Sequence, residues 1–186
     1  TVVHLGFRDS QPPVANFSFT PLHPTDLQTV VFADTSYDPD GFIVAWSWVF
    51  GDGNVSTLQN PSHRFYDEGL YNVSLTVSDN QSLNGTVSKQ IQVFNVPPVA
   101  NFTYSIINTT VSFSAASSID PDGIITTFLW VFGDGANGTG MNVTHTYPAY
   151  STYTVMLTVI DDDGNSSNII KTISILETTP PRIVDH

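Results

Sequence analysis

The chain has 186 residues, with 17 acidic residues against 5 basic ones, a net charge of −12, and no cysteine. The missing cysteine excludes disulfides, thiolate metal sites and a cysteine nucleophile. The acidity argues against nucleic acid or an anionic membrane as a partner, because both require a positively charged protein surface. No run of about 18 apolar residues occurs, so we predict no membrane span.

Two copies of one sequence unit make up most of the chain. DPDGFIVAWSWVFGDG at 38–53 recurs as DPDGIITTFLWVFGDG at 120–135, an offset of 82. PPVANF at 12–17 recurs at 97–102, so the first copy carries three extra residues in its first hairpin. The repeat predicts four segments of chain. These are a strand-like segment at 1–11, a domain at 12–96, a second domain at 97–179, and a tail or the start of a further unit at 180–186.

Both copies read as short strands separated by turns. In chain order, apolar residues alternate over 46–50, 71–77, 111–115 and 128–132. A period of two is typical of strands with one buried face, and no stretch shows helical periodicity. About seven such strands in roughly 83 residues predict an immunoglobulin-like β-sandwich for each copy. We expect Trp48 and Trp130 to lie at the centres of the two cores.

A longer pattern follows each WVFGDG motif. A histidine stands two residues before an aromatic residue, and then comes x-x-Tyr-x-Val-x-Leu-Thr-Val-x-Asp, which begins at Gly69 in the first copy and at Ser151 in the second. This pattern resembles the PKD (polycystic kidney disease) domain family, although Val49 and Val131 replace its usual Asp. The resemblance implies an all-β chain of two tandem immunoglobulin-like, PKD-type sandwiches without disulfides. It also implies an extracellular, noncatalytic protein, with calcium near the DPDG loop in some relatives.

Ten of the 13 asparagines head an Asn-x-Ser/Thr sequon, where chance predicts about three. This excess favours N-glycosylation and indicates an exported protein of an archaeon or a eukaryote. The alternative is accidental sequons on a Ser/Thr-rich β surface. We expect three of the asparagines on the solvent side of strands, namely Asn16, Asn72 and Asn101, and seven in loops, namely Asn54, Asn80, Asn84, Asn108, Asn137, Asn142 and Asn165.

Aspartates cluster in the DPDG loop, the GDG loop and the turn after the long late strand of each copy. Asp and Gly are common turn residues, and this explanation suffices for GDG. In an immunoglobulin-like sandwich the third and sixth strands are antiparallel neighbours, so the DPDG loop and the late turn lie at one end. Clustered oxygen ligands suit Ca²⁺. The candidate ligands of a structural calcium ion are Asp38, Asp40 and Asp79 in the first copy, and Asp120, Asp122, Asp161 and Asp163 in the second.

Catalytic motifs are lacking. None of the five histidines stands in a metal-binding spacing, and we expect His63 and His145 to bond to loop backbone. No G-x-S-x-G motif occurs, and GDG is not followed by a helix that could bind phosphate. We therefore predict no enzyme activity. An exposed sugar-binding strip of Phe42, Tyr66, Tyr147 and Tyr150 is a further hypothesis, although Tyr66 and Tyr147 fit better as covers of the sandwich ends.

Our first functional hypothesis is a structural and interaction module of a heavily N-glycosylated cell-surface or filament-forming protein. Such a module acts as a rigid spacer and as an adhesion or assembly unit, with neighbouring copies or domains as partners. The strand-like start at Val2–Phe7 could then pair with a neighbouring subunit by strand addition. The alternative is a noncatalytic accessory region of a secreted protease or glycoside hydrolase, which binds an extracellular polysaccharide or protein polymer.

Overall fold

A computed structural model describes residues 10–177, and over this range the chain forms strands and no helix. That part of the chain consequently offers no helix able to cross a membrane. The chain divides into two compact units, Thr1–Asn95 and Val96–His186, called domain 1 and domain 2 below. The predicted all-β fold of two sandwiches without disulfides is confirmed. Most of the strand-like segment predicted at 1–11, and all of the tail at 180–186, lie outside the described residues.

Domain 1 consists of a three-stranded and a four-stranded antiparallel sheet, ordered β1-β2-β5 and β4-β3-β6-β7. Its strands are β1 (Phe17–Thr20), β2 (Thr29–Asp34), β3 (Ile43–Val49), β4 (Val55–Ser56), β5 (Ser62–Arg64), β6 (Gly69–Asp79) and β7 (Asn84–Val93). The pairing of β3 with β6 is the one expected between the third and sixth strands of an immunoglobulin-like sandwich.

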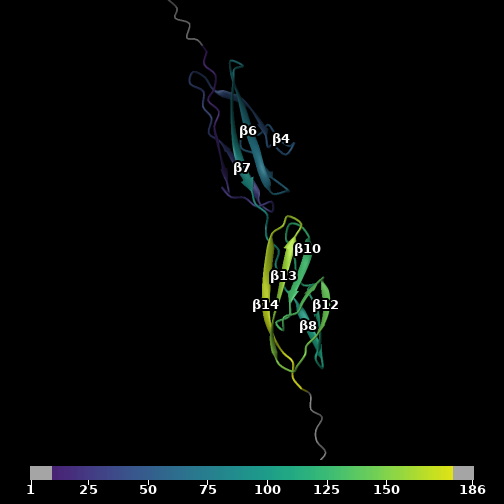
Figure 1. Cartoon of the computed structure of the whole chain (residues 1–186). Helices are drawn as coiled ribbons and strands as arrows, with labels where there is room; N and C mark the ends of the chain where they lie inside the picture. Colours follow the sequence, from purple (N-terminus) through teal and green to yellow (C-terminus); the bar gives the residue numbers. More distant parts are fainter. Residues whose placement is uncertain (1–9, 178–186) are drawn as a thin grey trace, which may run out of the picture. The chain divides into compact units, whose positions relative to one another are not determined.

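Domain 2 repeats this topology, with sheets ordered β12-β9-β8 and β11-β10-β13-β14. Its strands are β8 (Thr103–Ile107), β9 (Thr110–Ser114), β10 (Ile125–Val131), β11 (Asn137–Thr139), β12 (Asn142–Thr146), β13 (Thr152–Asp161) and β14 (Ser166–Ser174). In Figure 1, β10, β13 and β14 lie side by side, and β8 and β12 belong to the other sheet.

A tryptophan lies at the centre of each core, as the alternation of apolar residues predicted. Trp48 is 0% exposed and Trp130 is 1% exposed. Each indole N–H donates a 2.9 Å hydrogen bond to a backbone carbonyl, that of Leu58 in domain 1 and that of Gly140 in domain 2. The indole nitrogen is thus satisfied inside an apolar core, where an unsatisfied donor would be costly.

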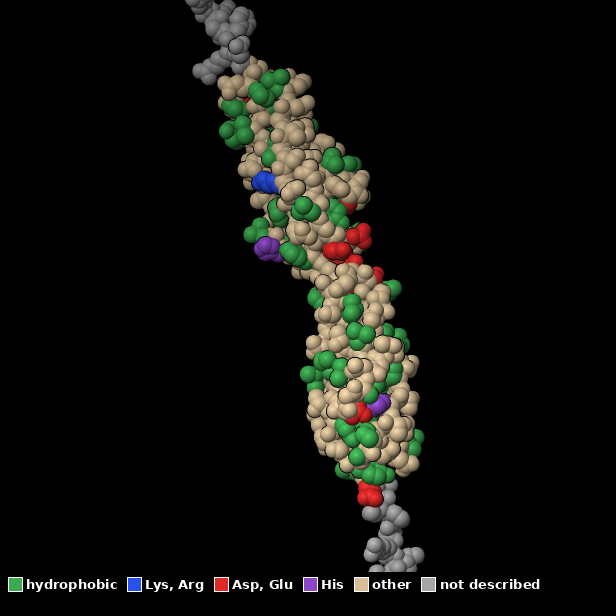
Figure 2. All heavy atoms as spheres, viewed as in Figure 1, with side chains coloured by type: hydrophobic (Ala, Val, Ile, Leu, Met, Phe, Trp, Pro, Cys, Tyr) green, Lys and Arg blue, Asp and Glu red, His purple; other side chains and the backbone are tan. Residues whose placement is uncertain are grey.

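Both lysines within residues 10–177 lie against an aromatic ring of their own domain. Lys89 lies over the ring of Phe17 at 4.8 Å and donates to the carbonyl of the same residue. Lys171 repeats both contacts with Phe102, at 4.6 Å from the ring. Because these ammonium groups are held against the sandwich, the surface offers little positive charge, and Figure 2 shows mostly uncharged side chains.

Candidate functional site

The DPDG loop of domain 1 and the turn after β6 lie at the same end of the sandwich. β3 and β6 run antiparallel, with Ile43 opposite Asp79. Asp79 is 2% exposed, and its Oδ1 accepts hydrogen bonds from the backbone N–H groups of Gln81 and Leu83, both at 2.8 Å. One carboxylate oxygen of Asp79 therefore shapes the turn.

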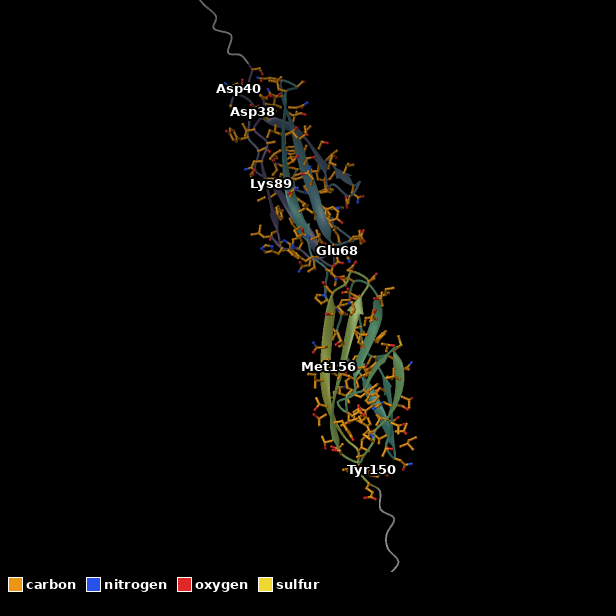
Figure 3. The ribbon with its side chains drawn as sticks, viewed as in Figure 1. Asp38, Asp40, Glu68, Lys89, Tyr150 and Met156 are labelled. Atoms are coloured by element: carbon orange, nitrogen blue, oxygen red, sulfur yellow. The ribbon has the colours of Figure 1, made fainter. Side chains whose placement is uncertain are left out.

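Oxygens from these two segments converge beside Gly41. A Cβ atom on this glycine would lie 2.7 Å from Asp38 Oδ2 and 2.3 Å from Asn80 Oδ1, so only glycine leaves room for both. Asp38 Oδ2 and Asp79 Oδ2 are buried and accept no hydrogen bond from the described residues. Asp40 is exposed at the same end of the domain, next to Asp38 (Figure 3).

Domain 2 repeats this arrangement with Asp162 in the place of Asn80. A Cβ atom on Gly123 would lie 2.5 Å from Asp162 Oδ1 and 3.2 Å from Asp120 Oδ2. Asp161 is 2% exposed, like its counterpart in domain 1. Asp162 therefore gives the cluster in domain 2 a carboxylate where domain 1 has the amide of Asn80.

Electrostatic crowding is evident at Asp120. Burial, reinforced by the neighbouring carboxylates of Asp122 and Asp161, raises the pKa of Asp120 to about 6. Asp122 Oδ2 accepts a 2.6 Å hydrogen bond from the backbone N–H of Val96, at the start of domain 2. Asp163 is exposed. A cation at this end of the domain would relieve the repulsion among these carboxylates.

All the side-chain atoms that could bind a metal at the DPDG end of each domain are oxygens, and oxygen ligands are those that Ca²⁺ prefers. Within residues 10–177, however, no three His, Cys, Asp or Glu side chains stand ready to hold a metal ion together. A bound ion would thus require amide or carbonyl oxygens as well as carboxylates. The oxygens that converge there belong to Asp38 and Asn80 in domain 1, and to Asp120 and Asp162 in domain 2. Asn80 and Asp162 were not among the ligands predicted from the sequence, although the repeat offset relates the two.

A second paired feature lies at each GDG loop. His63 Nε2 lies 2.6 Å from Asp52 Oδ2, and His145 Nε2 lies 2.7 Å from Asp134 Oδ2. We expected both histidines to bond to loop backbone, and this prediction is wrong, because the partner is a carboxylate in each domain. The GDG aspartates thus do more than shape a turn: each one anchors a histidine.

Aromatic rings enclose each of these pairs. The His145 ring stacks on Phe132 at 4.2 Å between centroids and meets Tyr147 edge-on at 4.5 Å. Burial alone would raise the pKa of Asp134, but hydrogen bonds from His145 and from the Ala136 N–H outweigh it and hold the pKa below its usual value. The contacts of the pair are aromatic rings and turn amides, so we interpret it as a structural element of the sandwich end.

All ten sequon asparagines are exposed, so the fold leaves each one accessible. Asn72 lies within β6 on its solvent side, as expected, whereas Asn16 and Asn101 lie just before β1 and β8. The expectation that seven lie in loops is wrong for the three that begin β7, β11 and β12, namely Asn84, Asn137 and Asn142.

The proposed aromatic strip does not exist as one surface. Tyr147 is 2% exposed and belongs to the core of domain 2, so its predicted role as a cover is correct. Tyr66 is 71% exposed, so the same prediction is wrong for it. Phe42 is 63% exposed in domain 1, and Tyr150 is 46% exposed in domain 2.

Comparison with known proteins identifies the family. The PKD domain matches at residues 10–93 and again at 95–175. The pre-pro-metalloprotease PrtV of Vibrio cholerae is 33% identical over 159 residues, which is 84% of this chain and 17% of PrtV. A microbial collagenase of Vibrio alginolyticus is 39% identical over 67 residues, 36% of this chain and 8% of that protein. The chain therefore spans less than a fifth of the length of these relatives.

Solved structures similar to this chain include PKD1 domains of two vibrios. The PKD1 domain of Vibrio anguillarum Epp is 35% identical, with a TM-score of 0.42, and the match covers 46% of this chain and 96% of that one. The PKD1 domain of PrtV is 35% identical, with a TM-score of 0.41, covering 45% of this chain and 98% of that one. PKD domains are noncatalytic modules, and this chain belongs to the PKD domain family, with two such domains in tandem.

Proposed function

We propose that the two domains form a noncatalytic accessory region of an exported protein and bind an extracellular polymer. The observation that carries this proposal is the match to PrtV, which includes 84% of this chain but only 17% of the metalloprotease. The matched segment consists of PKD domains, which are noncatalytic modules, so we infer that it assists a larger protein. The match supports the alternative predicted from the sequence better than the first hypothesis, a structural and interaction module of a cell-surface or filament-forming glycoprotein.

A protein polymer is the ligand class that we propose. Besides the collagenase of Vibrio alginolyticus, collagenase ColA of Clostridium perfringens is 44% identical over 64 residues of this chain. The names of these relatives give collagen as the substrate of those enzymes. A module that attaches to a fibre needs a broad surface rather than a deep pocket, and a β-sandwich presents two sheet faces.

Co-sedimentation of the whole chain with insoluble polymers tests this proposal. Fibrillar collagen, cellulose and chitin are incubated with the chain, and the bound fraction is measured at increasing protein concentration. We expect saturable binding to collagen, while an acidic globular protein without PKD domains stays in the supernatant. A chain that stays in the supernatant with all three polymers would refute polymer binding.

We also propose that the native protein is N-glycosylated, which supports export and an extracellular or cell-surface location. The exposure of all ten sequon asparagines supports this proposal. The hypothesis of a surface or filament glycoprotein depends on the same residues. Mass spectrometry of the native protein should show glycan-bearing peptides, and a protein of unmodified mass would contradict it.

We further propose a structural calcium ion at the DPDG end of each domain. The buried carboxylate oxygens of Asp38, Asp79 and Asp120, which accept no hydrogen bond from described residues, support it. An ion bound only by the folded state raises the melting temperature. Melting the chain in calcium and in EDTA should separate the two curves, and identical transitions would refute a structural ion.

A further inference from the structure

The outward faces of the four-stranded sheets differ between the domains at four positions of the repeat, although Val49 and Val55 are exposed apolar residues on the face of domain 1. The same positions of the repeat carry serine in domain 1 and aliphatic or Met side chains in domain 2. In domain 1 these residues are Ser47, Ser74, Ser78 and Ser88; in domain 2 they are Leu129, Met156, Ile160 and Ile170. Because both sheets share one register, the difference lies in side chains alone.

Strand register places the apolar residues of domain 2 side by side. Val131 of β10 is opposite Met156 of β13, which is in turn opposite Ile170 of β14. At about 4.8 Å between strands, this row is roughly 10 Å wide, and Leu129 and Ile160 extend it along β10 and β13. Ile170 is 58% exposed, Leu129 39% and Val131 38%. We call these five residues the apolar face, and Figure 3 marks Met156 on it.

The rest of this sheet surface is uncharged. The other outward residues of β10, β13 and β14 are Thr127, Thr152, Thr154, Thr158, Ser166, Asn168, Thr172 and Ser174. An open depression of about 480 Å³ adjoins the apolar face at the β10–β11 pair and is lined by Leu129, Trp130, Val131, Asn137, Gly138 and Thr139. No charged side chain interrupts this face, although the chain carries a net charge of −12.

The sequons follow the same division. The outward face of domain 1 carries the acceptor asparagines Asn72 and Asn84, at the positions that Thr154 and Ser166 occupy in domain 2. Asn137, opposite Val131, borders the apolar face on the edge strand β11. Glycans would therefore cover the sheet of domain 1 and leave the centre of the apolar face open.

We infer that the apolar face of domain 2 is the surface by which this chain binds a protein fibre, an inference that rests on the proposed function. The apolar area is on the order of 300 Å², a size at which exposed patches are often functional. Each partner of a stable complex buries about 800 Å², so a second copy would be held only weakly by this face. A fibre offers repeated sites, and repeated weak contacts add up through avidity.

The side chains favour a protein fibre over a polysaccharide. Sugar rings are held by stacking on aromatic side chains, and none of the five residues of the apolar face is aromatic. Aliphatic side chains instead bury apolar groups of another protein, and Met adapts to irregular surfaces. The absence of charge on the face also removes any repulsion toward a fibre of either sign.

Serine substitutions test the inference, because domain 1 carries serine at the same register and folds with it. The double variant Met156→Ser with Ile170→Ser, in the full chain without glycans, should bind fibrillar collagen about tenfold more weakly or worse. Ser74→Ala with Ser88→Ala, on the matching face of domain 1, is the control and should bind like wild type. If the double variant melts at a lower temperature than wild type, collagen binding is measured with Ile170→Ser alone, because Ile170 is the most exposed residue of the apolar face.

The reverse graft and the polymer panel separate the possible outcomes. Ser74→Met with Ser88→Ile should give domain 1 a second binding face and raise the amount of chain bound at saturation. If wild type binds collagen and the double variant binds equally well, the apolar face is not the binding surface, and the proposed function is unaffected. Binding to cellulose or chitin alone would overturn a protein fibre as the occupant. Concentration-dependent dimers abolished by the double variant would identify a second copy as the occupant instead, and no binding to any polymer would refute both proposals.

Discussion

Replacing Asp134 by Asn should destabilise domain 2 through one interaction. Asn keeps an oxygen for the Ala136 N–H at 3.0 Å but removes the charge that faces His145 Nε2 at 2.7 Å. The side chains of His145 and Asp134 are only 16% and 8% exposed, so solvent screens the pair weakly. A hydrogen bond to a charged group contributes roughly 1.5–3 kcal/mol to stability, so we expect the free energy of unfolding of domain 2 to fall by about 2 kcal/mol.

The effect of this substitution should depend on pH. The pKa of Asp134 in the folded state lies below its usual value of 3.8. A carboxyl group of this kind stabilises the fold above its unfolded pKa, and the contribution is lost as pH falls through the folded pKa. The difference between wild type and Asp134→Asn should therefore be full at about pH 5–7 and decrease as pH falls below 3.8.

Differential scanning calorimetry of the full chain from pH 2.5 to pH 7 measures this difference. For a domain of this size, a loss of 2 kcal/mol corresponds to a drop of roughly 10 °C in the melting temperature of domain 2. Asp67→Asn, at an exposed carboxylate in domain 1, controls for the loss of one surface charge. A melting temperature equal to that of wild type at pH 7, or a difference that does not decrease as pH falls below 3.8, would refute the reasoning.

Three further substitutions test the packing. Trp130→Ala should lower the free energy of unfolding in urea by about 3–5 kcal/mol, because it leaves a large cavity at a position that is 1% exposed. A decrease below about 1 kcal/mol would contradict the central place of Trp130 in the core. Gly85→Ala would place a Cβ atom 1.9 Å from Pro13 O, so domain 1 should lose about 1–3 kcal/mol in thermal melts; an unchanged melt would show that this backbone contact is loose. Lys171→Met removes the ammonium that lies over the Phe102 ring and its hydrogen bonds to the Phe102 carbonyl and Asn101, and thermal melts should show domain 2 destabilised by about 2 kcal/mol; an unchanged melt would show that these contacts do not stabilise the domain.

The sandwich fold was predictable because its signals are local and occur twice. The alternation around Trp48 and Trp130 marks the buried face of one strand, and the offset of 82 places the same strand in both domains. Turn residues between the strands then limit the topology to a sandwich. The pairing of β3 with β6 follows from that topology, and so does the meeting of the DPDG loop with the turn at Asp79.

The partners of individual side chains were not predictable in the same way. His63 stands eleven positions after Asp52, and only the folded course of β4 and β5 brings Nε2 within 2.6 Å of the carboxylate. Tyr66 illustrates a different error, because we grouped it with Tyr147 by residue type. The repeat offset relates Tyr147 to Phe65, which is 1% exposed, and leaves Tyr66 on the surface at 71%.

The five residues of the apolar face can be read in the sequence, but the sequence does not show that they form one surface. Met156 and Ile170 are ordinary strand residues until the register shows that they lie opposite each other and point outward. Ser74 and Ser88 occupy the same positions in domain 1, and their equivalence becomes informative only with that register. Pairing across strands is set by the whole sheet, so a single strand pattern does not reveal which residues share a patch.

A binding isotherm on fibrillar collagen, measured together with the release of soluble peptide from the same fibrils, tests the central claim most directly. A noncatalytic polymer-binding module should bind saturably and release no peptide above the rate of fibrils alone. Release of peptide that increases with the amount of chain would contradict the noncatalytic assignment. A bound fraction no higher than that of an acidic control protein would contradict polymer binding.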